Sequence, residues 1–339
     1  MNYLKISKNI TFNEHKKTFD YNNMKFKLFL FYLLFISILS FFDGESYAQT
    51  FTVEVQLKNQ PDNTIVFGSV KGDFFTVIDS TSLNQAFGKV KFTFPENAHP
   101  GVYRINLGTT TAGKILNEPP QFLDFIFDNE NLVFDTDFKA PVDNLKIIKS
   151  KENTVWFGFL AKDKIIRQNM ETLATEIDNN WLKGDTVKLV SKANEFNQIQ
   201  MERDMFISKI LEENRGLFAS LMIKNLREPL LDAYLTPAER KQAFKNEYFK
   251  TVDFTDPLLI NTSVYTDNIF KYLVSYNQYD FTQKQREAEY MKALEIIVPN
   301  IKPNNEVYRF LMGYLVHGFE VLQMESVISF ISKKYNFPQ

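Results

Sequence analysis

The chain of 339 residues contains no cysteine, and this absence excludes several kinds of chemistry. Without a thiol there is no thiol–disulfide exchange, no cysteine nucleophile and no thiolate metal site. The cysteine that would carry a lipid anchor after a signal peptide is missing too. A chain of this length can nevertheless bury enough apolar surface to fold without disulfides.

An excess of charge of one sign is also missing, as are the motifs of common enzymes. Basic and acidic residues number 39 and 41, and the two signs are interspersed. Nucleic-acid binding needs a basic stripe, so we expect no nucleic-acid partner. The chain has no G-x-S-x-G elbow, no Walker A loop and no G-x-G-x-x-G sequence. The sequence therefore assigns no catalytic, cofactor-binding or metal-binding residue, and no cofactor.

Only one long apolar run is present, and it lies near the start of the chain. Residues 28–42 carry no charge, follow two lysines and precede the small residues Ser46 and Ala48. This pattern is typical of a secretory signal peptide with an A-x-A-like cleavage site. The run of about 15 residues is shorter than the ~20 that a spanning helix needs. We predict a signal peptide over 24–48 and a mature protein that begins at Gln49, soluble in the periplasm or secreted, without a membrane span.

Residues 1–23 are a polar segment that precedes the predicted signal peptide. A signal peptide normally begins at the first residue of the chain. The pattern favours translation from Met24, with 1–23 as an upstream extension, and a long n-region is the alternative.

Alternating apolar and polar residues predict a β-rich module over 49–140. Phe51, Val53, Val55 and Leu57 alternate with polar residues, as in a half-buried strand. The turn residues 128–131 predict a hairpin. The predicted strands are 51–58, 65–70, 74–80, 89–94, 101–107, 122–127 and 132–138. Seven short strands at this spacing favour an antiparallel sandwich or barrel.

The apolar period changes from 2 to 3.6 beyond Pro141, which predicts an all-α domain over 150–339. Ser150 is a candidate N-cap, and the segments from Thr236 and Thr282 have capping-box sequences. Further helices are predicted over 187–213, 216–226, 264–276, 304–318 and 320–335, with the helix from Thr282 ending at Pro299. The predicted fold class is α+β, with an N-terminal antiparallel β-sandwich-like module followed by a helical domain.

Two stretches resemble a known family. In the strand region, Asp79-Ser80 and Gly88-Lys89-Val90-Lys91-Phe92 resemble the N-terminal β module of envelope thioredoxin-like (TlpA-like) thiol-disulfide oxidoreductases. In the helical region, Ser150-Lys151-Glu152-Asn153 and Asp253-Phe254-Thr255-Asp256-Pro257 resemble the segment that follows that module. The resemblance covers most of the mature chain and implies an envelope protein whose β module has no assigned function.

The family's catalytic part has no counterpart in this sequence. In the family a thioredoxin domain with Cys-x-x-Cys comes next, whereas this sequence ends at Phe337-Pro338-Gln339. No catalytic residue can be carried over. The sequence leaves two interpretations open, which are a stand-alone accessory module and a shortened reading frame.

Acidic residues and histidines are the candidates for metal or acid–base sites. The acidic residues cluster at Asp124, Asp128, Glu130, Asp135 and Asp137, where solvated turn and strand positions explain them better than a Ca²⁺ loop does. The mature chain has two histidines, His99 in a loop and His317 in an apolar helix with Glu320 three residues later. Metal sites need more ligands at helical spacing, so packed or surface histidines are favoured.

Aromatic residues near the domain junction are a candidate ligand groove. Trp156, Phe157 and Phe159 begin the helical domain, and four tyrosines follow at Tyr265, Tyr272, Tyr276 and Tyr279. Their spacing favours a helical core over direct ligand contact. Because Trp156, Phe157 and Phe159 begin the helical domain, we expect at least one of them to pack against the sheet. The two regions are expected to fold as separate domains joined near 141–149, with a proteolytic cut within 139–150 if the linker is exposed. Their interface is the expected ligand or partner surface, because pockets favour domain junctions.

The leading functional hypothesis is an exported, non-catalytic binding or interaction module, resembling the N-terminal region of thioredoxin-like oxidoreductases. Its partner would be an envelope protein or a small ligand. The alternative is a carboxylate-dependent hydrolase that acts on envelope glycans or peptides, which would need two carboxylates about 5–9.5 Å apart in a pocket. A third interpretation is a non-functional remnant.

Overall fold

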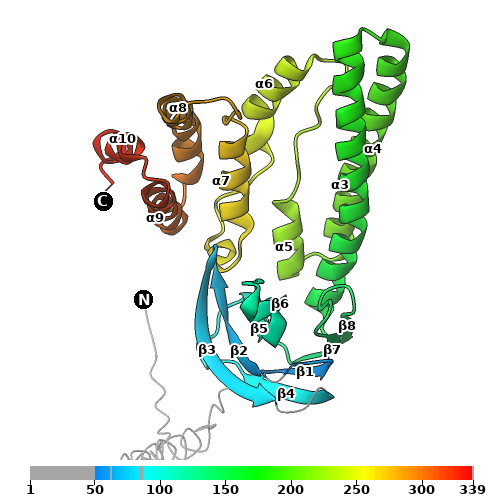
Figure 1. The fold of residues 1–339 in the computed structure, drawn as a ribbon, viewed down its shortest axis with the longest axis vertical. Coiled ribbons are helices and arrows are strands. Elements are labelled where there is room, and N and C mark those ends of the chain that lie inside the picture. Colours follow the sequence, from blue (N-terminus) through cyan, green and yellow to red (C-terminus); the bar gives the residue numbers. More distant parts are fainter. Residues whose placement is uncertain (1–49, 62, 84–86, 338–339) are drawn as a thin grey trace, which may run out of the picture. The chain divides into compact units, whose positions relative to one another are not determined.

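The computed structural model describes residues 50–61, 63–83 and 87–337. The predicted signal peptide and the residues before it lie outside this part of the chain. From Thr50 on, the chain forms one compact unit. Strands come first and helices follow, so the fold is mixed α+β as predicted (Figure 1).

The first part of the unit contains two four-stranded sheets, ordered β4-β1-β7-β8 and β3-β2-β5-β6. The strands are β1 (Thr52–Lys58), β2 (Asn63–Lys71), β3 (Phe74–Leu83), β4 (Phe87–Thr93), β5 (Gly101–Gly108), β6 (Gln121–Phe127), β7 (Leu132–Asp137) and β8 (Lys146–Lys149). Seven of these were expected, and β8 was not. A short helix, α2 (Thr111–Ile115), lies between β5 and β6 and was also not expected.

One strand pairing corrects the expectation of purely antiparallel sheets. β1 pairs antiparallel with β4 but parallel with β7, with Val53 opposite Leu132 and Lys58 opposite Asp137. The remaining pairings are antiparallel. Parallel pairing of β1 and β7 needs a long connection, and here the intervening strands supply it.

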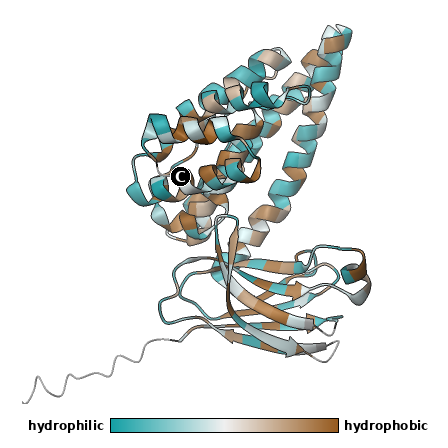
Figure 2. Ribbon diagram, turned by 60° about the vertical axis from the view of Figure 1, so that its left-hand side comes forward, coloured by the Kyte–Doolittle hydropathy of each residue, from teal (hydrophilic) through white to brown (hydrophobic). Residues whose placement is uncertain are grey.

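Side chains from both sheets form one hydrophobic cluster. β1 and β5 alternate strictly between buried and partly exposed residues, and the sequence pattern predicted this alternation for β1. Figure 2 shows hydrophobic and hydrophilic residues side by side along the strands. Phe67 lies at the centre of an aromatic group, with ring centroids 5.2 Å from Phe92, 5.3 Å from Phe94 and 5.8 Å from Tyr103. This burial of aromatic area dominates the stability of the strand module.

The helices follow β8 without any further strand among the described residues. They are α3 (Lys151–Lys183), α4 (Thr186–Glu213), α5 (Phe218–Lys224), α6 (Pro237–Glu247), α7 (Val264–Val274), α8 (Gln283–Ile301), α9 (Asn305–Val321) and α10 (Glu325–Tyr335), with the 3₁₀ turns η2 (Tyr248–Lys250) and η3 (Pro257–Asn261). None of the helices in this part of the chain is long and apolar enough to cross a membrane.

The helix ends follow the capping residues of the sequence. Ser150 caps α3, and the capping boxes of Thr236 and Thr282 are both formed. α3 ends at Gly184, whose φ of 69° is in the left-handed region that favours glycine. The expected end at Pro299 is wrong, because α8 continues to Ile301 with the proline inside its last turn.

α3 and α4 form a long antiparallel pair, and the later helices surround a second and larger hydrophobic cluster (Figure 1). This cluster includes Ile126 of β6, so it reaches the strand module. Helices and sheets therefore share part of their buried surface.

Candidate functional site

The first turn of α3 connects the strand module to the helices. The buried Asn153 side chain accepts a hydrogen bond from the backbone N–H of Ile126 (2.8 Å) and donates one to the carbonyl of the same residue (2.7 Å). The buried carboxylate of Glu152 accepts from the N–H groups of Phe218 (3.1 Å) and Ala219 (2.7 Å) at the start of α5. This turn therefore fixes strand β6 and helix α5 relative to each other.

Ser150 completes this junction. Its hydroxyl donates to Glu130 (2.5 Å), and its oxygen accepts from the backbone N–H of Asn153 (3.0 Å). Burial raises the pKa of the Glu152 carboxyl, and the two hydrogen bonds that it accepts from backbone N–H groups oppose that rise. The buried carboxylate thus has a structural role as the cap of α5.

The tip of the β2–β3 hairpin is held against the helices. Gly72 lies at this tip with a φ of 56°. Its N–H donates to the carbonyls of Ile260 and Thr262, both at 3.1 Å. A Cβ atom here would lie 2.7 Å from Phe310 and 2.9 Å from Thr266, so the position requires glycine. The next residues of the hairpin are therefore carried to a fixed place beside α7 and α9.

An apolar groove of about 330 Å³, which we call the hairpin groove, lies beside this tip. Four apolar side chains in its lining are largely exposed, namely Phe74 (45%), Phe270 (62%), Val321 (69%) and Leu322 (54%). The other lining residues are Asp73, Leu273, Tyr314, Leu315, His317, Gly318 and Phe319. Pockets that take ligands are usually about 300–1,000 Å³ and mostly apolar, and the groove meets both conditions.

Asp73 is the one carboxylate among the described residues that line the hairpin groove. It accepts a hydrogen bond from the Thr266 hydroxyl (3.0 Å) and another from the hydroxyl of Tyr314. Burial, and then the bond to Asp73, raise the pKa of Tyr314. Since a carboxylate offers about four acceptor sites, Asp73 can accept further hydrogen bonds from a ligand.

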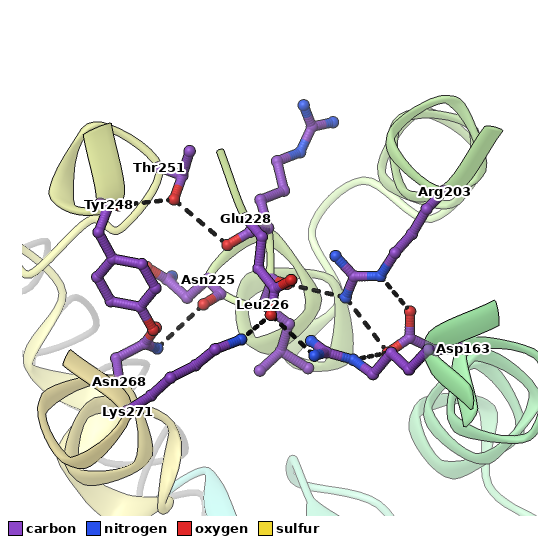
Figure 3. Close-up of polar contacts among 11 residues, drawn as sticks. Asp163, Arg203, Asn225, Leu226, Glu228, Tyr248, Thr251, Asn268 and Lys271 are labelled. Carbon is purple, nitrogen blue, oxygen red and sulfur yellow. Dashed lines mark hydrogen bonds and ion pairs between the residues drawn. The ribbon is translucent and has the colours of Figure 1, made fainter. Parts of the chain in front are cut away.

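Charged side chains form a second candidate site between α3, α4 and α7 (Figure 3). Arg203 and Asp163 are buried and form a two-point ion pair, with N–O distances of 2.7 and 3.3 Å. Arg203 also donates to the carbonyl of Leu226 (3.0 Å). Arg167 donates to Asp163 (2.7 Å) and to Glu228 (2.8 Å). These contacts fix the segment after α5 against the α3–α4 pair.

Lys271 extends this polar cluster to α7. Its ammonium group contacts the carboxylate of Glu228. Burial, followed by the positive charges of Arg167 and Arg203, lowers the pKa of Lys271 to about 7. The Glu228 carboxylate opposes this shift, because an adjacent negative charge favours the ammonium form. Positive and negative side chains alternate along the cluster, in the order Arg203, Asp163, Arg167, Glu228 and Lys271. This alternation is typical of a structural ion-pair network.

A small cavity of about 150 Å³ lies next to Lys271. Glu228, Asp267 and Asn268 are among its lining residues, and burial raises the pKa of Asp267. Asn268 is held in place by the hydroxyl of Tyr248, which donates to it at 2.7 Å (Figure 3). The volume is about half the lower end of the usual range of ~300–1,000 Å³ for ligand pockets, so the cavity suits water or a small ion rather than a sugar ring.

A third and wider cavity, of about 450 Å³, lies where α4 and α5 meet the strand module. Its lining residues are Pro100, Asp128, Leu211, Arg215, Gly216, Leu217, Phe218, Ser220, Leu221, Lys224 and Leu258. This cavity and the hairpin groove both take residues from the strands and from the helices. That is the junction at which the sequence led us to expect a ligand or partner surface.

The acidic residues of 124–137 have separate partners and do not point into one site. Among the described residues, no group of three or more His, Asp or Glu side chains comes together as metal ligands would. The partners are Arg104 for Asp124 (2.6 and 2.7 Å), Asn129 for Asp128 (3.1 Å), Ser150 for Glu130 (2.5 Å), Lys58 for Asp135 (2.7 Å) and Asn59 for Asp137 (2.6 Å).

The two histidines lie at the surface, as the sequence favoured. His99 is exposed in the loop before β5, where its carbonyl accepts from the hydroxyl of Tyr103 (3.2 Å). His317 lines the hairpin groove, 3.8 Å from Glu320 and with its ring 5.7 Å from that of Phe74. Glu320 thereby places a second carboxylate next to the groove.

The aromatic residues of the junction belong to the core, as expected, except Tyr279, for which the expectation is wrong. Phe157 packs against the strand cluster, which confirms that one of the three packs against the sheet. Phe159 is buried between α3, α4 and α5, with Trp156 beside it. Among the tyrosines, Tyr265, Tyr272 and Tyr276 are buried and Tyr279 is fully exposed.

Sequence analysis did not anticipate the hairpin groove or the polar cluster, because their residues come from distant segments. One signal for the cluster was present. The buried positions of α4 are Leu189, Ala193, Gln200, Arg203 and Ile207, so Arg203 is the one charged residue on the buried face of this helix. A charged residue at such a position indicates a buried partner.

Comparison of the chain with family models, curated proteins and solved structures gives no match.

Proposed function

We propose that this chain is an exported, non-catalytic binding or interaction module, and that the hairpin groove is its binding site. The observation that supports the proposal most is the exposure of four large apolar side chains in one groove beside a rigid hairpin tip. Contiguous apolar surface of this kind marks interaction sites, whereas apolar residues that are exposed singly need no explanation.

The two sheets are proposed to form a β-sandwich-like module that supports this groove. The hydrophobic cluster shared by both sheets supports this proposal. The module is further proposed to correspond to the N-terminal region of TlpA-like oxidoreductases. In support, Ser150, Glu152 and Asn153, which carry part of that resemblance, make the hydrogen bonds of the junction.

Site-specific photocrosslinking in the producing cell tests the binding function. A photoreactive amino acid at Phe270 should give one discrete adduct, which mass spectrometry identifies. The same residue placed at Ile165, which is equally exposed on α3, is the matched control. Equal and heterogeneous adducts from both positions would contradict a binding site at the groove.

N-terminal sequencing of the protein from the envelope fraction tests export. A mature start at Gln49 is expected from the residues before it. Protein that retains Met24 and stays with the membrane would instead be an uncleaved anchor. The DNA downstream of the codon for Gln339 separates the two family interpretations, since a frame that encodes Cys-x-x-Cys would indicate a shortened oxidoreductase.

A carboxylate-dependent hydrolase is the second candidate function, and one observation favours it. Glu228 and Asp267 both line the 150 Å³ cavity, and burial raises the pKa of Asp267. Because the cavity is too small for a sugar ring, only the scissile bond of a substrate would enter it. Glu228→Gln and Asp267→Asn would each abolish hydrolysis of envelope glycans or peptides if this function were correct. Wild-type protein without such activity, or variants that retain it, would exclude this cavity as a hydrolytic site.

A further inference from the structure

The hairpin groove has a rigid wall and a fixed charge. Gly72 is hydrogen-bonded to the helical part, so Asp73 and Phe74 directly after it have set positions. The hydroxyls of Thr266 and Tyr314 both donate to the Asp73 carboxylate. A site that is already ordered loses little conformational entropy when it binds, which favours affinity.

The charge around the hairpin groove is negative. Asp73 lies in its lining, and Glu320 stands beside His317. The basic side chain next along the hairpin, Lys71, lies over the ring of Phe310 (5.6 Å) rather than in the lining. An occupant with an apolar part and a positive group would therefore complement both features of the groove.

The shape of the site suits an extended protein segment. Four of the apolar lining side chains are roughly half to two-thirds exposed, so the groove is open and would leave a small molecule largely in water. Phe74 also begins β3, and the order β3-β2-β5-β6 places β3 at the edge of its sheet. An open strand edge beside apolar pockets is a common way of binding extended peptides.

We propose that the hairpin groove binds an extended segment of a partner protein in which a large apolar side chain is adjacent to lysine or arginine. The apolar side chain lies between Phe74, Phe270 and Leu322, and the basic group pairs with Asp73. This inference rests on the proposed function, because it names the class of partner for the same groove.

Selection from a random peptide library displayed on phage tests the inference. The bait is the purified chain, and the Phe270→Ser variant removes peptides that bind elsewhere. The selected peptides should combine a large apolar residue with an adjacent lysine or arginine. A synthetic peptide of the selected sequence should lose affinity about fivefold to tenfold when its basic residue is changed to glutamine.

Substitution of the groove carboxylate gives the reciprocal measurement. Asp73→Asn should lower the affinity for the basic peptide by the same factor and leave the affinity for its glutamine variant unchanged, since the two changes remove one interaction. Asparagine can still accept from Thr266 and Tyr314, so the fold is retained. Asp79→Asn, at an exposed position on β3 after the turn that holds Asp73, is the matched control and should have no effect.

The outcomes separate this inference from the proposed function. Apolar peptides without a basic residue, or affinity that is insensitive to Asp73→Asn, would overturn the inference and leave the groove as a binding site. If every peptide selected without the Phe270→Ser step binds that variant as well as the wild type, both are overturned. Failure to select peptides, together with binding of lipid vesicles that depends on Phe270, would overturn the inference in favour of a membrane contact.

Discussion

Single buried polar side chains connect the parts of this molecule. The side-chain amide of Asn153 accepts a hydrogen bond from the backbone N–H of Ile126 in β6 and donates one to its carbonyl. A neighbouring strand would pair with these two groups in the same way. The burial of Asn153 is complete, so water cannot replace these hydrogen bonds. The stability of the junction therefore depends on one side chain to an unusual degree.

Replacing Asn153 with alanine is expected to destabilise the protein by about 2 kcal/mol or more, because a buried N–H and a buried C=O lose their partner. Urea denaturation measures the change. Asn300→Ala is the matched control, since this asparagine is exposed on α8 and donates to a carbonyl of its own helix (2.8 Å). Equal effects of the two substitutions would show that the junction does not depend on Asn153.

The lowered pKa of Lys271 predicts a pH dependence of stability. In the unfolded chain this lysine keeps its proton up to about pH 10.4, whereas in the folded protein it begins to lose it near pH 7. The unfolded state then binds more protons, so this residue's contribution to the free energy of unfolding rises with pH above about 7 and is constant below it.

Lys271→Met should remove that contribution. The difference in free energy of unfolding between wild type and variant should increase between about pH 7 and 9 in favour of the wild type. Denaturation in urea at several pH values measures it. Lys209→Met, at an exposed position on α4, serves as the control. Parallel curves for wild type and Lys271→Met would mean that Glu228 keeps the lysine charged throughout this range.

At the scale of elements, the α3–α4 pair has charged residues where helices usually carry apolar ones. Asp163 on α3 and Arg203 on α4 are both buried and paired with each other. Asp163→Asn is expected to cost about 3 kcal/mol or more, because it leaves a buried guanidinium without its counter-ion. Glu213→Gln, in the exposed pair with Lys209, should change stability by less than about 1 kcal/mol. Chemical denaturation measures the free energy of unfolding of both variants. Equal losses would show that burial of the ion pair does not increase its contribution to stability.

Many elements could be predicted from the sequence because their signals are local. The capping boxes at Thr236 and Thr282 lie where helices begin, and the alternation from Val53 to Leu57 matches the burial of β1. Asn129 has a φ of 52° in the turn predicted at 128–131. Each of these features depends on a few neighbouring residues, so a single sequence contains the information.

The pairing of elements could not be predicted in the same way. The parallel contact between β1 and β7 depends on which apolar faces fit together after folding, and no local pattern indicates it. The hairpin groove could not be predicted for the same reason. Phe74 and Phe270 line one groove because the N–H of Gly72 is hydrogen-bonded to the carbonyls of Ile260 and Thr262. Pro299 shows the opposite case, where tertiary packing of α8 overrides a local stop signal.

At the scale of the whole molecule, limited trypsin digestion tests the predicted linker, where a cut is expected within 139–150. Lys139 is exposed in a turn, whereas Lys146 and Lys149 belong to β8, so the first cut is expected after Lys139. The fragments should elute together in size-exclusion chromatography, because Asn153 and Gly72 join the two parts by hydrogen bonds. Resistance of the bond after Lys139 while trypsin cuts elsewhere would contradict the first part of this prediction. Fragments that elute separately would contradict the second part.

The parallel pairing of β1 with β7 has a consequence for how the chain is made. Of the described strands, β1 leaves the ribosome first, yet its parallel neighbour β7 is complete only at Asp137. Closing so long a loop is slow, so one edge of β1 stays open while the intervening strands are synthesised. If the chain is exported before it folds, this delay is compatible with transport of an unfolded precursor. A fragment that ended before Leu132 would keep that edge open permanently and would tend to aggregate through it.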